Sequence, residues 1–459
     1  MKNISKRTVR RVCYVVLGVA VLILLLKIIV DRYIIIDIEK TFPNEKFREV
    51  VSEKFDLNHD GKLSRREIDE VKEIKLDIWF EDGPITLQGI EVFRNLEVLD
   101  CNSCYISELD VRALRKLREL DCGFNEIAKL DLSKCKELVT LNCTSNEMRE
   151  LKIDNCSKLE ELDCSNNILT SVSKKLSNLR RLSCDCNQLK ELDITCYPHL
   201  ELLTCFDNQI KKLDMSSVGK EFWLLDCSDN EMEELILWSD AGSYHRESLV
   251  TCRNNRITNL DLSPLNFLTM LDCSGNPLTD LDLKKHVSLS ELSCVNTGLV
   301  HLDISNNTEL KTLECGGNPL AELDFSNNHE LTALYVQGLG LTQLDLSPCP
   351  KLESLDCSNN SLTELSVEKV PKLERLYCSH NELKELKLKG YVTLLALECA
   401  SNRLTELEVD IVDHGHTHID CRINPLTTVY SNYSPRGFQS DGGVKLIVTD
   451  EKYEGGEEY

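Results

Sequence analysis

The residues best suited to chemistry lie in one short segment near the start of the chain, FDLNHDGKLSRREI, which runs from Phe55 to Ile68. Oxygen donors recur there at near-alternate positions and come from Asp56, Asn58, Asp60, Lys62, Ser64 and Glu67. Lys62, the seventh residue counted from Asp56, would contribute its backbone carbonyl. Gly61 stands where such a loop must turn sharply. Oxygen donors of this number and spacing are the ligands that Ca²⁺ prefers. The segment therefore predicts a calcium site, with a plain turn between two helices as the alternative.

This segment resembles the calcium loop of EF-hand proteins. Its flanks have a helical pattern, because Phe47, Val50, Val51 and Phe55 share one face before the loop and SRREIDEVKEI follows it. The resemblance covers about residues 41–76 and implies a helix–loop–helix unit that binds calcium through the six residues named above. EF-hand sensors normally pair two such loops, whereas this sequence shows one. We therefore expect a structural ion rather than a regulatory switch.

A second candidate metal site lies near the end of the chain. The segment DHGHTHID places three imidazoles at alternate positions, those of His414, His416 and His418. On a strand all three would share one side, as a transition-metal site requires. His416 also occupies a leucine position of the repeat described below, so core or cap packing of part of the trio is the alternative.

Carboxylates recur in two columns, and neighbours at strand spacing could raise one another's pKa enough for acid–base catalysis. The first column is mainly acidic and reads Asp100, Asp121, Asn142, Asp163, Ser183, Thr204, Asp226, Thr251, Asp272, Ser293, Glu314, Tyr335, Asp356, Tyr377, Glu398, Asp420. The second reads Asp110, Asp131, Asp193, Asp214, Asp261, Asp282, Asp303, Asp324, Asp345. A catalytic site is normally a single constellation, so we predict no catalytic residue. We expect a solvated acidic face, open to basic ligands, from the first column, and turn hydrogen bonds from the second.

The element that must position these residues is a short tandem repeat. A cysteine recurs mostly every 21 residues, with Val336 once in its place, in the column Cys101, Cys122, Cys143, Cys164, Cys184, Cys205, Cys227, Cys252, Cys273, Cys294, Cys315, Cys357, Cys378, Cys399, Cys421. An apolar residue usually stands two and five places before each member, and an Asn usually follows three places later. A fixed short period of this kind is typical of a solenoid whose coils stack on their neighbours.

The repeats resemble leucine-rich repeats, and their 21-residue form is similar to the internalin-like repeats of bacterial surface proteins. The resemblance covers about residues 77–430 in about 16 repeats. It implies an α/β-type solenoid, a right-handed coil with a parallel β-sheet on its concave face, whose open N-terminal end the helical segment 41–76 would cap. Alternation in L-x-C agrees, because Leu and Cys point inward and the residue between them outward. The Asn suits the turn after the strand, where its amide can satisfy backbone groups of the next coil.

The 22 cysteines are interpreted mainly as core thiols. A thiol is small and often buried, so it fills a narrow slot much as Val336 does. Cysteines on adjacent strands would lie about 4.8 Å apart, wider than the Cβ separation of about 3.8 Å in a disulfide. Cys101 and Cys104 form a C-x-x-C pair by coincidence of two columns rather than as a zinc or redox site. Cys135 and Cys156 share a slot in consecutive returns and are the best candidates for a disulfide, with free thiols as the alternative.

The first 32 residues differ from the rest. Val12 to Val30 is a run of 19 residues, apolar except for Lys27, which is near the length that crosses a bilayer. Basic residues precede it and place the N-terminus in the cytoplasm. We expect an uncleaved signal anchor, with a cleaved signal peptide as the alternative. The chain carries a net charge of −23, of which these 32 residues contribute +6 and the remainder −29, and this disfavours nucleic acid and anionic lipid as partners.

The sequence thus predicts a single-pass cell-membrane protein whose bulk is extracytoplasmic. Its parts are a basic cytoplasmic tail (1–11), a transmembrane anchor (12–30), a linker (31–40), the calcium-binding cap (41–76), the repeats (77–430), and a C-terminal cap with an acidic tail (431–459). The predicted function is recognition or adhesion, with an extracellular protein or a cell-envelope glycan as partner. Two alternatives stay open: an envelope spacer without a specific ligand, and an enzyme that uses the acidic concave face.

The predicted recognition patch lies where the repetition breaks. The step from Cys227 to Cys252 is 25 residues long, and its insertion should leave the coil as a surface loop. Aromatic and Arg side chains are common interface anchors. The insertion and the two coils before it supply five of them: Phe206, Trp223, Trp238, Tyr244 and Arg246. The alternative is that Trp238 folds back to fill the gap that the insertion makes.

Overall fold

A computed structural model describes residues 35–76, 84–243, 247–391, 394–410, 417–432, 435 and 437–448. It divides into two compact units, Met1–Gln188 and Leu189–Tyr459, and each is described by itself. The predicted anchor, residues 12–30, lies outside the described residues. Within the described ranges, no helix has the length and apolarity that a membrane crossing needs.

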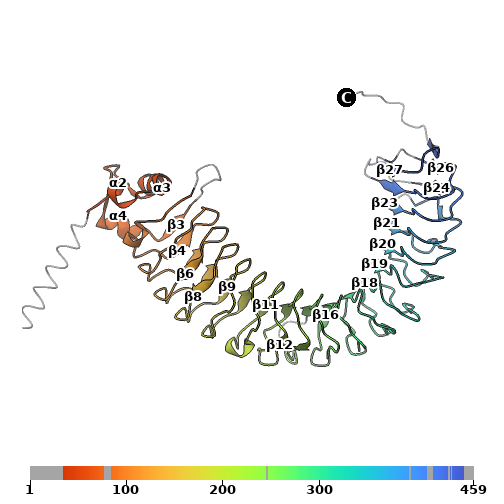
Figure 1. The fold of residues 1–459 in the computed structure, drawn as a ribbon, viewed down its shortest axis with the longest axis horizontal. Coiled ribbons are helices and arrows are strands. Elements are labelled where there is room, and N and C mark those ends of the chain that lie inside the picture. Colours follow the sequence, from red (N-terminus) through yellow and green to blue (C-terminus); the bar gives the residue numbers. More distant parts are fainter. Residues whose placement is uncertain are drawn as a thin grey trace, which may run out of the picture. The chain divides into compact units, whose positions relative to one another are not determined.

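The first unit begins with a small cap around the predicted loop (Figure 1). Asn44 caps the helix that precedes the loop by accepting from the N–H of Phe47 at 3.0 Å. Phe47 and Val51 face the core from that helix. Both flanking helices are present, although the second ends earlier than its sequence pattern suggests. The elements are β1 (Ile35–Asp37), α2 (Ile38–Thr41), α3 (Glu45–Phe55), β2 (Lys62–Ser64) and α4 (Arg65–Glu70).

One parallel sheet follows in the first unit, with one strand per coil. Leucines align across it, so that Leu99 pairs with Leu120 and Leu120 with Leu141. A short 3-10 turn, η2 (Ile90–Val92), precedes the second strand. The sheet strands are β3 (Glu73–Lys75), β4 (Val98–Asp100), β5 (Glu119–Asp121), β7 (Thr140–Asn142), β9 (Glu161–Asp163) and β10 (Arg181–Ser183). The return segments, which lead from one sheet strand back to the next, also contain a strand pair, β6 (Lys129–Asp131) with β8 (Glu150–Lys152).

The second unit repeats the arrangement (Figure 1). After η3 (Ile194–Cys196), its sheet contains β11 (Leu202–Thr204), β13 (Leu224–Asp226), β15 (Ser248–Thr251), β16 (Leu268–Asp272), β17 (Glu291–Ser293), β18 (Thr312–Glu314), β19 (Ala333–Tyr335), β20 (Ser354–Asp356), β21 (Arg375–Tyr377), β23 (Ala396–Glu398), β25 (His418–Asp420) and β27 (Gly437–Gln439). Return strands pair as β12 (Lys212–Asp214) with β14 (Glu234–Ile236), and as β22 (Lys387–Leu388), β24 (Leu407–Val409), β26 (Thr428–Ser431) and β28 (Lys445–Val448). The predicted parallel solenoid is confirmed. Its stacking continues to Val448, past the predicted repeat end at residue 430, because the last coil pairs normally without the Cys–Asn template.

The Leu and Cys positions form the core of each coil. The thiols of the column are at most 1% exposed, as is Val336 in the same slot. Burial raises the pKa of column thiols such as Cys122, Cys143 and Cys315, for Cys315 to about 12, so these thiols stay protonated at neutral pH. No disulfide joins any two cysteines of the described residues. Cys135 and Cys156 do not pair, because each thiol instead donates to a carbonyl one coil earlier, at 3.6 and 3.5 Å.

The Asn column joins each coil to the one before it. The Nδ2 of Asn167 donates to the carbonyls of Cys164 and Ser165 in its own coil and of Cys143 in the preceding coil, at 3.0–3.1 Å. Its Oδ1 accepts from the N–H of Met148, also in the preceding coil, at 2.9 Å. The amide therefore satisfies the preceding coil rather than the next one. Thr297 and Leu339 occupy this slot in two coils, and Leu339 has no side-chain donor.

The Asp column of the returns forms turns, as predicted. In all nine members a carboxylate oxygen accepts from the N–H two residues later. The Asp303 carboxylate, for example, accepts from the N–H of Ser305 at 3.2 Å and from its hydroxyl at 2.7 Å. These aspartates therefore stabilise the local turns of their coils.

Candidate functional site

The predicted calcium loop is closed by its own backbone amides. The Asp56 carboxylate is 3% exposed and accepts from the N–H groups of Asp60 and Gly61 at 3.2 and 2.9 Å. Asn58 Oδ1 also accepts from the Asp60 N–H, and Asp60 Oδ1 accepts from the Lys62 N–H at 2.9 Å. These hydrogen bonds fold the segment from Asp56 to Lys62 into a tight loop. Gly61, at φ 75°, supplies the sharp turn that the sequence predicted.

Glu67, the twelfth residue of the loop, spans it from the start of α4. Its two carboxylate oxygens accept from the N–H groups of Leu57 at 3.0 Å and Ser64 at 2.7 Å. The Ser64 hydroxyl accepts in return from the Glu67 N–H, which completes a capping box. Hydrogen bonding to Ser64 first, and to the Leu57 and Asn58 amides next, holds the pKa of Glu67 below its usual value, although burial opposes this. The carboxylate is therefore charged at neutral pH.

The donor set of the loop fits a hard cation in its chemistry, since it offers carboxylate, amide and carbonyl oxygens at the required spacing. In the described residues, however, no three His, Cys, Asp or Glu side chains come together as a metal cluster. To bind an ion, Glu67 would have to exchange its amide partners for the metal. Ser64, at the ninth place, is engaged in the cap of α4.

Within the described residues, neither His418 nor the C-x-x-C pair belongs to a metal cluster. His418 lies in β25, opposite Ala396 and Gly437, while His414 and His416 lie outside the described residues. The Cys104 thiol donates to the Asn102 carbonyl at 3.3 Å, and burial raises its pKa to about 11. Cys104 occupies the Asn slot, as the sequence reading holds.

The predicted recognition patch is not assembled as expected. Trp238 is 0% exposed and packs edge-on against Phe222, with ring centroids 4.6 Å apart. The prediction that Trp238 belongs to a surface patch is therefore wrong, and the alternative, in which it fills the gap left by the insertion, is correct. Phe206 and Trp223 are half-buried on neighbouring coils. Tyr244 and Arg246 lie outside the described residues.

The insertion is anchored by a residue that the sequence reading missed. Asp240 is 1% exposed, and its carboxylate accepts from the N–H groups of Asn266 and Phe267 at 2.6 and 2.8 Å. It also accepts from the Asn266 side chain and from the Ser248 hydroxyl, at 2.8 and 3.0 Å. One buried carboxylate thus ties the insertion to the next coil. A lone Asp in a polar loop gives no sequence signal for this role.

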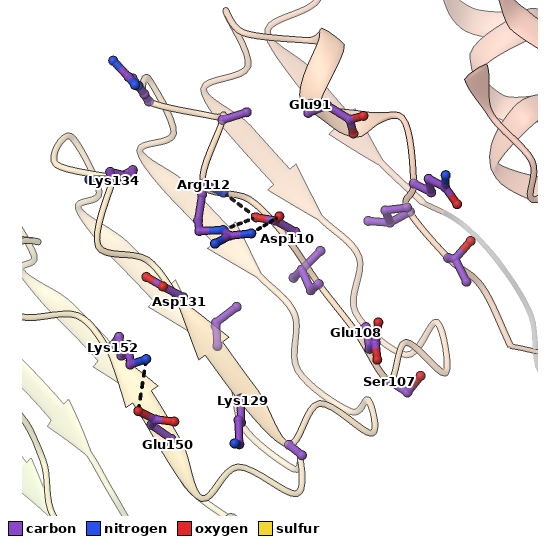
Figure 2. A pocket seen from close by; sticks show the side chains of 18 residues that line it. Glu91, Ser107, Glu108, Asp110, Arg112, Lys129, Asp131, Lys134, Glu150 and Lys152 are labelled. Atoms are coloured by element: carbon purple, nitrogen blue, oxygen red, sulfur yellow. Dashed lines mark hydrogen bonds and ion pairs between the residues drawn. The ribbon is translucent and has the colours of Figure 1, made fainter. Parts of the chain in front are cut away.

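A large groove of about 1310 Å³ opens in the first unit over β6 and β8 (Figure 2). Its charges balance, since five basic and five acidic side chains line it: Arg112, Arg115, Lys129, Lys134, Lys152, Glu91, Glu108, Asp110, Asp131 and Glu150. Figure 2 shows two internal pairs, Arg112 with Asp110 at 2.7 Å and Lys152 with Glu150 at 3.2 Å. Without net charge or an exposed apolar anchor, the groove favours no class of partner.

A smaller hollow of about 450 Å³ lies on the sheet face of the second unit, over β20, β21, β23 and β25. Its lining combines small residues, among them Ser379, Ala400 and Ser401, with larger ones: Tyr377, His380, Arg422 and Ile423. Four carboxylates line it, those of Asp356, Glu398, Asp420 and Asp441. Arg422 pairs with Asp420 through two bonds of 2.9 and 2.6 Å, which leaves the acidic charge in excess.

Ile423 stands out in this hollow. The residue two places after each column Cys, or after Val336, has a positive φ of 50–68° in every coil, a conformation that favours Gly, Asn and Asp. Most coils place Asn, Asp, Ser or Gly there. Phe124 in the first unit and Ile423 in the second are bulky exceptions, 59% and 66% exposed. At both positions an unfavourable backbone conformation coincides with an exposed apolar side chain. The sequence could have shown this, because both residues depart from the types that otherwise fill the column.

Parallel strands stacked one per coil, a Leu–Cys core and an Asn column joining neighbouring coils define a leucine-rich-repeat protein. The chain carries leucine-rich repeats and is similar in structure to bacterial internalins. The family described as Leucine Rich repeats (2 copies) matches residues 350–390. No curated protein matches the chain in sequence.

Several solved structures share this leucine-rich-repeat fold. The functional domain of InlJ from Listeria monocytogenes, which includes a cysteine ladder, is 26% identical, with a TM-score of 0.68 over 86% of this chain and 82% of that one. The internalin InlF from the same organism is 22% identical, with a TM-score of 0.60 over 71% and 98%. A leucine-rich-repeat protein of Leptospira interrogans is 21% identical, with a TM-score of 0.57 over 69% and 92%. The latter two show the fold alone.

Proposed function

We propose that the chain is a membrane-anchored, extracytoplasmic recognition protein whose sheet face binds a basic segment of another protein. The observation that carries this proposal is the acidic hollow of the second unit, with the exposed Ile423 among its lining residues. Charge complementarity selects Lys or Arg on the partner, and Ile423 selects an apolar side chain beside them. The anchor at residues 12–30 and its orientation rest on the sequence.

A fluorescent 11-residue peptide of alternating Lys and Leu tests this proposal against the full-length chain in detergent. Anisotropy should show saturable binding, no binding of the matched Glu–Leu peptide, and weaker binding of a Lys–Ser peptide. Ile423→Asn should lower the affinity for the Lys–Leu peptide at least fivefold. Phe124→Asn makes a similar change in the first unit and should leave the affinity within twofold. No saturable binding would favour the spacer alternative, and unchanged binding by Ile423→Asn would refute the site.

We further propose that the Asp56–Glu67 loop binds one structural calcium ion. Asp56, Asn58, Asp60 and Glu67 would supply side-chain oxygens, Lys62 its carbonyl, and Ser64 a direct or water-mediated contact. The burial of the Asp56 and Glu67 carboxylates supports this proposal, because burying such groups without a cation is costly. Isothermal titration should find one site, which Glu67→Gln abolishes. Absence of both calcium heat and a thermal shift at millimolar ion would refute it.

A further inference from the structure

The cap contains a strand pairing that the sequence did not reveal. β1 lies antiparallel to β2, with Ile36 opposite Leu63. The Ile38 N–H donates to the Gly61 carbonyl at 3.2 Å. Hydrogen-bonded pairs alternate along an antiparallel ladder, so Ile36 and Leu63 form the next such pair. Leu63 is the eighth residue of the calcium loop and is fully buried.

The segment that follows β1 is fixed to the first coil of the solenoid. Phe42, directly after α2, is 0% exposed and stacks on Phe93 with ring centroids 5.8 Å apart. It also meets Phe47 of α3 edge-on at 5.4 Å. Gly89, at φ 100°, makes room for this contact, since a Cβ there would lie 2.6 Å from both the Phe42 ring and the Thr41 carbonyl. Residues 35–42 are thus held by the loop on one side and by the solenoid on the other.

We propose that β1 takes the place of the second loop against which an EF-hand loop normally pairs, so that calcium binding and the docking of residues 35–42 are coupled. This inference rests on the proposed calcium site. β2 begins at Lys62, whose carbonyl is a proposed ligand, and the Gly61 carbonyl beside it accepts from Ile38, the residue directly after β1. Pairing with β1 therefore fixes the part of the loop that carries this ligand. Because coupling between two equilibria is reciprocal, calcium strengthens β1 docking by the same factor by which docking strengthens calcium binding.

A proline pair tests the coupling by calcium titration of the full-length chain in detergent. Ile36→Pro removes the N–H of a bonded pair, whereas Ile35→Pro places the same ring one residue away, where the N–H points out of the ladder. We expect Ile35→Pro to bind calcium within twofold of wild type and Ile36→Pro to bind at least tenfold more weakly. Circular dichroism should show an intact solenoid in both. Equal affinity in the two variants would overturn the coupling while the calcium site stands.

Hydrogen exchange of the wild-type chain provides a measurement that needs no β1 variant. Calcium should slow exchange at the amides of Ile36 and Ile38 at least tenfold, and should leave them unchanged in Glu67→Gln. Unchanged exchange in a chain that binds calcium would overturn the coupling alone. A wild-type chain that takes up no calcium would refute the calcium site and, with it, the coupling.

Discussion

Asn318 reaches back to the preceding coil and donates from Nδ2 to the carbonyl oxygen of Cys294 at 2.7 Å. The same nitrogen donates to the Cys315 carbonyl at 2.8 Å. Oδ1 of Asn318 accepts from the amides of Thr297 and Gly298 at 3.0 and 2.8 Å. A single buried amide therefore satisfies backbone groups of two coils, most of them buried.

Asn318→Ala should be among the most damaging single changes in the second unit. It leaves several buried backbone groups unpaired, and each such group costs about 1–3 kcal/mol; we expect a loss of at least ~3 kcal/mol in the free energy of unfolding. Asn306→Ala is the matched control, because Asn306 is exposed and donates one bond to the Lys284 carbonyl at 3.1 Å. Urea denaturation should show a loss of under ~1 kcal/mol there. Similar losses for both variants would contradict the role given to Asn318.

The cysteine slot should accept an apolar residue and reject a polar one. Cys315→Val copies Val336 of the next coil, and such a swap should change the free energy of unfolding by less than ~1.5 kcal/mol. Cys315→Ser should cost about 1–3 kcal/mol, because it buries a hydroxyl in an apolar slot. Native-state labelling should find the Cys315 thiol unreactive at pH 8, since burial raises its pKa to about 12. A serine variant as stable as the valine variant would show that the slot is polar.

Ile423→Asn should stabilise the protein even though it weakens partner binding. Ile423 has a φ of 56°, a region that costs a non-glycine residue about 1–2 kcal/mol and Asn less. We expect a gain of roughly 0.5–1 kcal/mol in chemical denaturation. The reverse change three coils earlier, Asn359→Ile, should destabilise by a similar amount, because Asn359 has the same conformation at φ 54°. A loss of stability in Ile423→Asn would mean that the side chain is needed for the fold.

The return aspartates should make the fold sensitive to acid. The Ser305 hydroxyl, and then its N–H, hold the pKa of Asp303 below the ordinary value of 3.8. The unfolded chain then takes up the proton first, so this stabilisation is complete above about pH 4 and is lost as the pH falls through the folded-state pKa. Asp303→Asn should therefore be less stable than wild type at pH 7, with a difference in urea midpoint that shrinks below about pH 4. A difference that stays constant down to pH 2 would contradict this linkage.

Much of the solenoid was predictable because each column has one physical role repeated many times. The Leu–Cys alternation fixed which side chains are buried, and the Asn and return Asp positions indicated where turns need side-chain acceptors. Ile423 was detectable in the same way, since its column otherwise holds residues suited to a left-handed backbone. It was not predictable whether each Asn bonds to the preceding or to the following coil, because a periodic sequence pattern is the same in both directions.

The features that sequence could not predict depend on contacts made once. Trp238 is buried because Phe222 and the insertion create a pocket for its ring, which no column describes. Asp240 is an anchor only because the amides of Asn266 and Phe267 point at it. β1 pairs with β2 although IID is too short to be recognised as a strand, and the coil at residues 437–448 stacks without the template. In each case tertiary contacts decide the outcome.

The two gaps in the Asn column give the second unit an uneven resistance to mechanical load. Each coil is held to its neighbour by strand pairing and by the Asn bonds, and stacked repeats interact almost entirely with their nearest neighbours. At Leu339 the coil has no side chain to donate to the Cys315 carbonyl, and at Thr297 the hydroxyl donates within its own coil, to Cys294, at 2.9 Å. A pull along the array would therefore open these two junctions before the others. Under load, the protein would lengthen in steps as these two junctions open. The coils around the Ile423 hollow would meanwhile keep their folded structure.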